Sequence, residues 1–218
     1  MIVLLTFFLI WSVVSSRWVQ DCSDGPAIGS IVDVRIEENE PVQIRRQHDS
    51  GWAKAEKGMT LCTGDQIRSR FRSKAHVLLK DGRGGQEVDV VVGVNTRIRT
   101  TGDWNGRQEK SQNAPVLEVV HGVVRLKLAD EETGAVDLVR TGPSTCRLAG
   151  EGILANWDPF KREANYVVEK GDVSCMFNDS TVVVGAGKSL EIASGVPGRV
   201  KPTVPLILDA FTRATEFD

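Results

Sequence analysis

Residue types that commonly carry enzyme chemistry occur in this chain, but their spacing favours structural roles. The segment Gly185-Ala186-Gly187-Lys188-Ser189 ends like a phosphate-binding loop. That motif requires a further glycine five residues before Gly187, where this chain has Val182. The residues after Ser189 also read as a strand, whereas the motif needs a helix N-terminus to hold phosphate. The pattern therefore predicts a hairpin turn.

The histidines and acidic residues do not form a catalytic or metal-binding pattern either. His48-Asp49-Ser50 contains the residue types of a catalytic triad, but adjacent residues cannot converge as nucleophile, base and orienter. His76 and His121 stand alone, without metal-ligand spacing. Asp103-Trp104-Asn105-Gly106 opens like a calcium loop, but no further oxygen ligands follow in register. We expect no catalytic residue, no cofactor and no metal site.

Composition narrows the class of protein. The chain has 218 residues and a net charge of −2, which argues against general binding to nucleic acid, because that requires a basic stripe. Its 21 glycines predict many tight turns, and valine is abundant while long helix-forming runs are scarce. These features favour a β protein.

The N-terminal residues 1–20 predict a signal peptide or membrane anchor. An apolar run from Met1 ends in Ser15-Ser16, which fits the core and cleavage zone of a secretory signal. No Lys or Arg precedes the run, so either the signal is atypical or the coding sequence begins upstream. Asp21 stands where a lipoprotein needs a small residue before Cys22, so simple export is favoured over lipidation. We expect a periplasmic or extracellular protein, in contact with a membrane only through this segment if it stays uncleaved.

Residues 28–195 show the alternation of apolar and polar side chains that is typical of strands. Two runs show it clearly: Val88, Val90 and Val92, and then Val124, Leu126 and Leu128. Turn residues separate such runs by about 8–12 residues, which favours a sandwich or a coiled β stack.

The order of the turn and strand motifs resembles the FecR-type domain. The motifs are, in order, Trp52, Gly64-Asp65-Gln66-Ile67-Arg68-Ser69, Asp81-Gly82, Leu117 with Gly122 and Val124, Val139-Arg140-Thr141 before Pro143, Val168-Glu169 with Gly171 and Val173, and Val184-Gly185-Ala186-Gly187. The resemblance implies an all-β domain of stacked antiparallel hairpins outside the cytoplasm. It also implies that Trp52 is a core residue.

The tail, residues 196–218, has a different character. Three prolines are followed by a segment that places Ile207, Phe211 and Ala214 on one helical face, with Thr203 as the expected N-cap. We predict a short C-terminal helix after the β domain.

Two polar segments, 101–114 and 156–164, interrupt the strand pattern and predict solvated loops. Each contains a tryptophan beside a charged residue, and binding residues concentrate in loops on β scaffolds. The candidate partner-binding residues are Trp104, Arg107, Trp157 and Asp158.

The four cysteines are widely spaced, which argues against zinc and thioredoxin chemistry. Cys146 shares its strand parity with Leu148, and Cys175 shares its parity with Val173 and Phe177, so both sulfur atoms are expected to face the core. They form either a disulfide bond or two buried thiols.

Three functions are compatible with these features. The first is a non-enzymatic exported FecR-like domain that binds a partner protein or a cell-envelope component in signal sensing. The second is the sensor half, or a fragment, of a FecR-type transmembrane anti-sigma regulator. The third is an envelope glycan hydrolase, which needs two converging carboxylates that no motif indicates.

Overall fold

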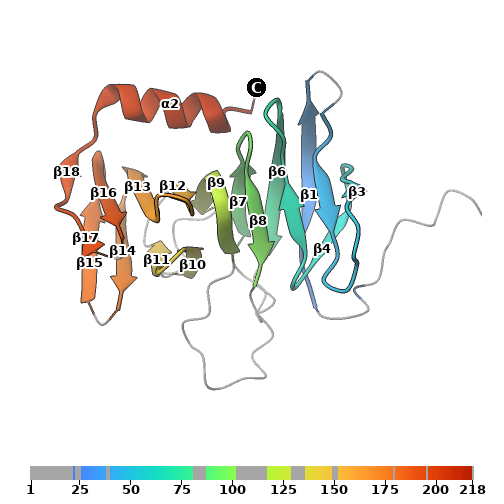
Figure 1. Ribbon diagram of the computed structural model, residues 1–218, viewed down its shortest axis with the longest axis horizontal. Coiled ribbons are helices and arrows are strands. Elements are labelled where there is room, and N and C mark those ends of the chain that lie inside the picture. Colours follow the sequence, from blue (N-terminus) through green and yellow to red (C-terminus); the bar gives the residue numbers. More distant parts are fainter. Residues whose placement is uncertain are drawn as a thin grey trace, which may run out of the picture.

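The computed structural model describes residues 22, 26–37, 40–80, 87–101, 117–128, 136–148, 152–178, 180–194 and 196–217. Over these residues the chain is built from β-strands with one short C-terminal helix (Figure 1). The prediction of an all-β fold with a C-terminal helix is confirmed. The predicted N-terminal segment 1–20 lies outside the described residues. Within the part that is described, no helix is long and apolar enough to cross a membrane.

The strands form two sheets. Sheet 1 contains, in spatial order, β4 (Thr60–Cys62), β1 (Ala27–Ile36), β6 (Ser73–Lys80), β7 (Glu87–Val92), β9 (Leu117–Leu128), β12 (Gly152–Asp158), β13 (Glu163–Lys170) and β16 (Lys188–Ala193), followed by β17 (Val196–Pro197) and β18 (Lys201–Pro202), which both pair with β16.

Sheet 2 contains, in spatial order, β3 (Ala53–Lys54), β2 (Gln43–Arg45), β5 (Gln66–Arg68), β8 (Arg97–Thr100), β9 again, β10 (Val136–Thr141), β11 (Ser144–Leu148), β14 (Asp172–Phe177) and β15 (Ser180–Gly185). The successive hairpins β10–β11, β12–β13 and β14–β15 belong to sheet 2, sheet 1 and sheet 2 in turn. Among the described pairings, β9 with β10 is parallel and the others are antiparallel.

Strand β9 belongs to both sheets. Its first part, residues 117–121, pairs with β8, and its second part, residues 124–128, pairs with β7. The strand turns from one sheet to the other at Gly122, whose φ is 92°. A Cβ atom on Gly122 would lie 2.4 Å from Thr96 Oγ1 and 2.7 Å from the carbonyl oxygen of Asn95, so both the space and the dihedral angle require glycine.

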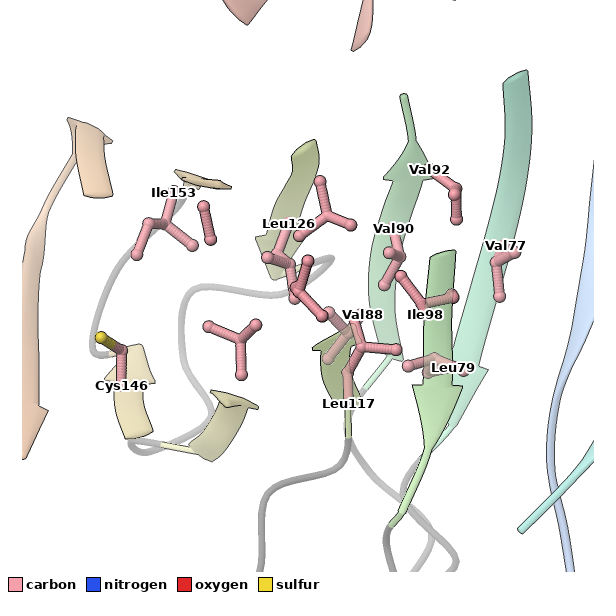
Figure 2. Packing of buried hydrophobic residues seen from close by; sticks show 14 of the residues in the cluster. Val77, Leu79, Val88, Val90, Val92, Ile98, Leu117, Leu126, Cys146 and Ile153 are labelled. Atoms are coloured by element: carbon pink, nitrogen blue, oxygen red, sulfur yellow. The ribbon is translucent and has the colours of Figure 1, made fainter. Parts of the chain in front are cut away.

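The core lies between the two sheets. On β6 the buried residues Ala75, Val77 and Leu79 alternate with more exposed ones, as the sequence pattern requires of a strand with one face inward. Figure 2 shows side chains of both sheets, including Val90 of sheet 1 and Ile98 of sheet 2, within one apolar cluster. This shared core holds the sheets together.

Two disulfide bonds are present, one between two strands and one between Cys22 and a strand. Cys146 on β11 lies directly opposite Cys175 on β14, and the pair is bonded. The second bond joins Cys22 to Cys62 in β4, with the Cα atoms 5.6 Å apart, and the sequence analysis did not anticipate it. All four cysteines of the chain are therefore paired. The Cys22 sulfur cannot carry a lipid thioether while it holds this bond.

Helix α2 (Pro205–Thr215) lies over the outer face of sheet 1, and in Figure 1 it runs from β18 and β16 toward β6. Its last turn is fixed by the Lys74 ammonium group, which donates to the carbonyl oxygens of Arg213 at 2.7 Å and Glu216 at 2.9 Å. The prediction of Thr203 as N-cap is wrong. Val204 occupies that position and makes no side-chain capping bond.

Candidate functional site: a tryptophan among arginines

Three short strands of sheet 2 share one sequence pattern. They are Gln43-Ile44-Arg45 in β2, Gln66-Ile67-Arg68 in β5 and Arg97-Ile98-Arg99 in β8. The three isoleucines lie opposite one another and are buried in the core. Because side chains alternate along a strand, the flanking glutamines and arginines point to the outer face of the sheet.

The pairing of these strands brings positive charges together. Arg68 lies directly opposite Arg97, and Arg45 lies opposite Gln66. Like charges on opposite positions of an antiparallel pair are destabilising. The interaction between the paired strands therefore does not explain why these arginines lie opposite each other.

Trp52 lies over this face, immediately before the short strand β3. Its ring centroid is 4.1 Å from the Arg68 guanidinium carbon, 5.1 Å from that of Arg45 and 5.3 Å from that of Arg97. These distances are within the range of cation–π interaction. We call these four residues, Arg45, Trp52, Arg68 and Arg97, the arginine–tryptophan cluster.

The interpretation of Trp52 as a core residue is wrong. The ring is half-buried on the outside of sheet 2, whereas the nearby Ala55 occupies the buried position and is 1% exposed. On the outer surface, the large indole ring can contact the aliphatic parts and the guanidinium groups of the arginine side chains. A small alanine, by contrast, fits the space between the two sheets.

Two glutamine side chains orient the arginines. Arg68 Nε donates to Gln43 Oε1 at 2.7 Å, and Arg97 Nε donates to Gln66 Oε1 at 2.9 Å. Gln66 is 7% exposed, so its amide is a fixed acceptor. Among the described residues, neither Nη atom of Arg68 has a hydrogen-bond partner. The guanidinium groups are thus held in place while donors remain available.

Within the described residues, the charge of the cluster is not compensated by carboxylates. No ion pair joins Arg45, Arg68 or Arg97 to a carboxylate of the described residues; at the edge of the face, Arg99 is paired with Glu118 at 3.3 Å. Burial, followed by the charges of neighbouring guanidinium groups, lowers the pKa of both Arg68 and Arg97. An anion bound here would relieve this repulsion.

His121 lies beside the arginine–tryptophan cluster. It lies opposite Arg97 at the start of the β9 turn. Burial lowers the pKa of His121, a hydrogen bond with the Asn95 backbone opposes that effect, and the charge of Arg97 lowers the pKa further. The histidine is therefore kept neutral more strongly than an exposed one.

The structure assigns Trp157 a different place from the predicted loop. It lies within β12, opposite Gly122 and Ala164, and its ring covers Gly142 so closely that a Cβ there would be 2.3 Å from a ring carbon. The prediction of a solvated loop over 156–164 is wrong, since β12 extends to Asp158 and β13 begins at Glu163.

Asp158 shapes the turn that follows β12. Its Oδ1 accepts from the backbone N–H groups of Phe160 at 3.0 Å and Lys161 at 3.2 Å, which is the geometry of a turn stabilised by an Asp side chain. Phe160 at this tip is 97% exposed. The other two predicted residues, Trp104 and Arg107, lie outside the described residues.

Other titratable groups make structural contacts. Asp65, in the Gly64-Asp65 turn, accepts from the Cys62 backbone N–H at 2.8 Å and forms an ion pair with Arg46. His76 Nε2 lies 2.8 Å from Asp89 Oδ1, beside the end of α2. In the part of the chain that the structure describes, no group of three or more His, Cys, Asp or Glu side chains is arranged to hold a metal ion.

Comparison with solved structures shows a related architecture. Two crystal structures of a proposed anti-sigma factor from Parabacteroides distasonis ATCC 8503, at 1.65 and 2.50 Å resolution, each match with a TM-score of 0.51 and 16% sequence identity. The proteins share a fold. The match covers 67% of this chain and 63% of the other, so the chain spans about 63% of the length of the protein it resembles. No protein-family model matches, and no curated protein matches.

Proposed function

We propose that this chain is an exported, non-enzymatic FecR-like domain that binds a partner protein and takes part in signal sensing. The observation that carries the proposal is the arginine–tryptophan cluster on the outer face of sheet 2. Tryptophan and arginine are the residues most enriched among the energetically dominant positions of protein interfaces. A rigid sheet presents them without further ordering of the backbone, which lowers the cost of binding.

Two further observations support this function. Disulfide bonds persist in oxidising compartments, so the bonds Cys22–Cys62 and Cys146–Cys175 agree with export. The shared fold with a proposed anti-sigma factor agrees with a regulatory role rather than turnover of a substrate. On sheet 1, by contrast, the outward-facing pair Arg125–Glu169 is an internal ion pair between β9 and β13.

The second candidate function is the sensor part of a FecR-type transmembrane anti-sigma regulator. The fold shared with a proposed anti-sigma factor supports it. Deletion of the gene should then change transcription of a single sigma-factor regulon. An unchanged transcriptome would leave the binding domain without this regulatory role.

Site-specific photo-crosslinking in the native cell tests the main proposal. A photoreactive phenylalanine analogue replaces Arg99, an exposed residue at the rim of the cluster, and in a control it replaces Lys188, an exposed residue on β16. We expect one protein to be captured from position 99 and not from position 188, and to bind the purified domain afterwards. Identical crosslinks from both positions, or none at all, would contradict the proposal.

A further inference from the structure

We propose that the arginine–tryptophan cluster binds carboxylate groups in an acidic segment of the partner protein. This inference rests on the proposed function only in assuming that the partner is a protein. It adds the chemistry of recognition, namely ionised Glu or Asp side chains held by a fork of guanidinium groups against an indole ring.

The geometry of the cluster suits a planar anion. Arg68 is fixed by Gln43 through its Nε, so the two Nη groups form one edge that can donate two parallel hydrogen bonds. Arg97 is held more fully, because Gln66 Oε1 accepts from both its Nε and its Nη2, and its Nη1 group faces no such acceptor among the described residues. Arginine matches a carboxylate in this bidentate geometry, whereas a lysine would offer only a point charge.

The electrostatics of the cluster favour an anionic occupant. Arg68 and Arg97 occupy opposite positions on paired strands, and Arg45 lies over the same indole ring. In the described residues, no acidic side chain forms an ion pair with any of the three. A carboxylate placed between the guanidinium groups would remove like-charge repulsion that the folded chain otherwise bears.

The surroundings favour a short acidic peptide segment over a long polyanion. The chain has a net charge of −2 and a pI near 6.0, so its overall field repels nucleic acid and other extended polyanions. Beside the cluster, the charge of Arg99 is balanced by Glu118. The positive region is therefore compact, and it fits a few carboxylates on a flexible chain.

Fluorescence anisotropy with the purified, disulfide-intact full chain tests this inference. The probe is a fluorescein-labelled peptide of alternating Glu and Gly residues, and a peptide with Gln in place of Glu is the neutral control. We expect the acidic peptide to bind, the neutral peptide not to bind, and the affinity to fall as salt is raised.

Matched variants separate specific recognition from general charge. Arg68→Ala should weaken binding about tenfold or more, because a hydrogen-bonded charge pair is lost. Arg68→Lys, which keeps the charge and loses the fork, should recover only part of the affinity. Lys188→Ala removes the same charge from β16 and should leave binding unchanged. Thermal unfolding of each variant checks that the fold is intact.

Several outcomes would overturn the inference. Equal weakening by Lys188→Ala and Arg68→Ala would show that only net charge matters. Tighter binding of a short single-stranded DNA, or of vesicles containing an anionic lipid, would assign the cluster to another class of ligand. A crosslinked partner that binds the Arg68→Ala variant at full strength would leave the proposed function standing and remove the carboxylate site.

Discussion

Charge is arranged differently on the outer face of sheet 1 and in the arginine–tryptophan cluster of sheet 2. On sheet 1, under and beside α2, opposite charges are matched: Arg125 makes two 2.8 Å hydrogen bonds to Glu169, and His76 lies 2.8 Å from Asp89. On sheet 2, Arg68 and Arg97 lie opposite each other on the neighbouring strands β5 and β8, with no carboxylate of the described residues between them.

This difference separates the charges that stabilise the fold from the charges that are available for binding. A paired, partly buried charge gains hydrogen bonds in the native state, and removal of either partner leaves the other desolvated. A row of like charges gains nothing from proximity and costs free energy. The first arrangement is explained by stability alone. The second is explained when the domain has an anionic ligand.

The largest effect is expected where β9 joins the two faces. Gly122→Ala should lower the free energy of unfolding by about 3 kcal/mol, because the new Cβ meets Thr96 and Asn95 and the dihedral angle disfavours a side chain. Gly187→Ala is the matched control. It has a similarly positive φ of 71° but nothing within 4 Å of the new Cβ, so it should cost about 1–2 kcal/mol. Urea unfolding measures both, and equal losses would mean that the corner is not tightly packed.

A smaller effect is expected when an arginine that is ion-paired on sheet 1 is compared with an arginine of the arginine–tryptophan cluster. Arg125→Ala should lower the free energy of unfolding by about 1–2 kcal/mol, because it leaves Glu169, which is 18% exposed, without its bidentate partner. Arg45→Ala removes the same side chain from the arginine–tryptophan cluster and should change it by no more than about 0.5 kcal/mol. Chemical denaturation of the two variants side by side tests this. A larger loss from Arg45→Ala would show that the cluster is a stabilising device.

The smallest effect is expected in the pH dependence of stability that is due to His121, beside the arginine–tryptophan cluster. Since the pKa of His121 is lowered in the folded state, the unfolded chain takes up a proton first as the pH falls below about 6.5. Stability due to this group is present above that pH and is lost on acidification. His121→Gln should therefore flatten the fall in melting temperature between about pH 7 and pH 5. If the melting temperatures of the variant and the parent protein fall in parallel with pH, His121 does not contribute to the pH dependence of stability.

Much of the fold could be predicted because one face of most strands is buried. The alternation of Val88, Val90 and Val92 places these residues in the core, as the sequence indicated. Strand β12 and the first residues of β13 were missed because polar residues such as Asn156 and Asn165 mask the alternation, and Pro159 lies in the turn between the two strands. Composition alone cannot separate such a hairpin from a solvated loop.

The candidate site carried a signal that the sequence analysis did not use. The triplets at residues 43–45, 66–68 and 97–99 each hold an isoleucine between two polar residues and end in arginine, and that pattern predicts basic positions on the face opposite the core. Their proximity could not be predicted, because β2, β5 and β8 are neighbours in space while β3, β4, β6 and β7 intervene in the chain. The bond between Cys22 and Cys62, at a separation of 40 residues, was hidden for the same reason.

The sharing of β9 also makes both sheets depend on one strand. Residues 117–128 pair with β7 and β8 on one side and with β12 and β10 on the other. The strand lies near the middle of the chain, so neither half can complete a sheet by itself. Contacts between distant segments make such folding slow. We therefore expect one cooperative transition, in which a break in β9 unfolds both halves together and no half survives as a fragment.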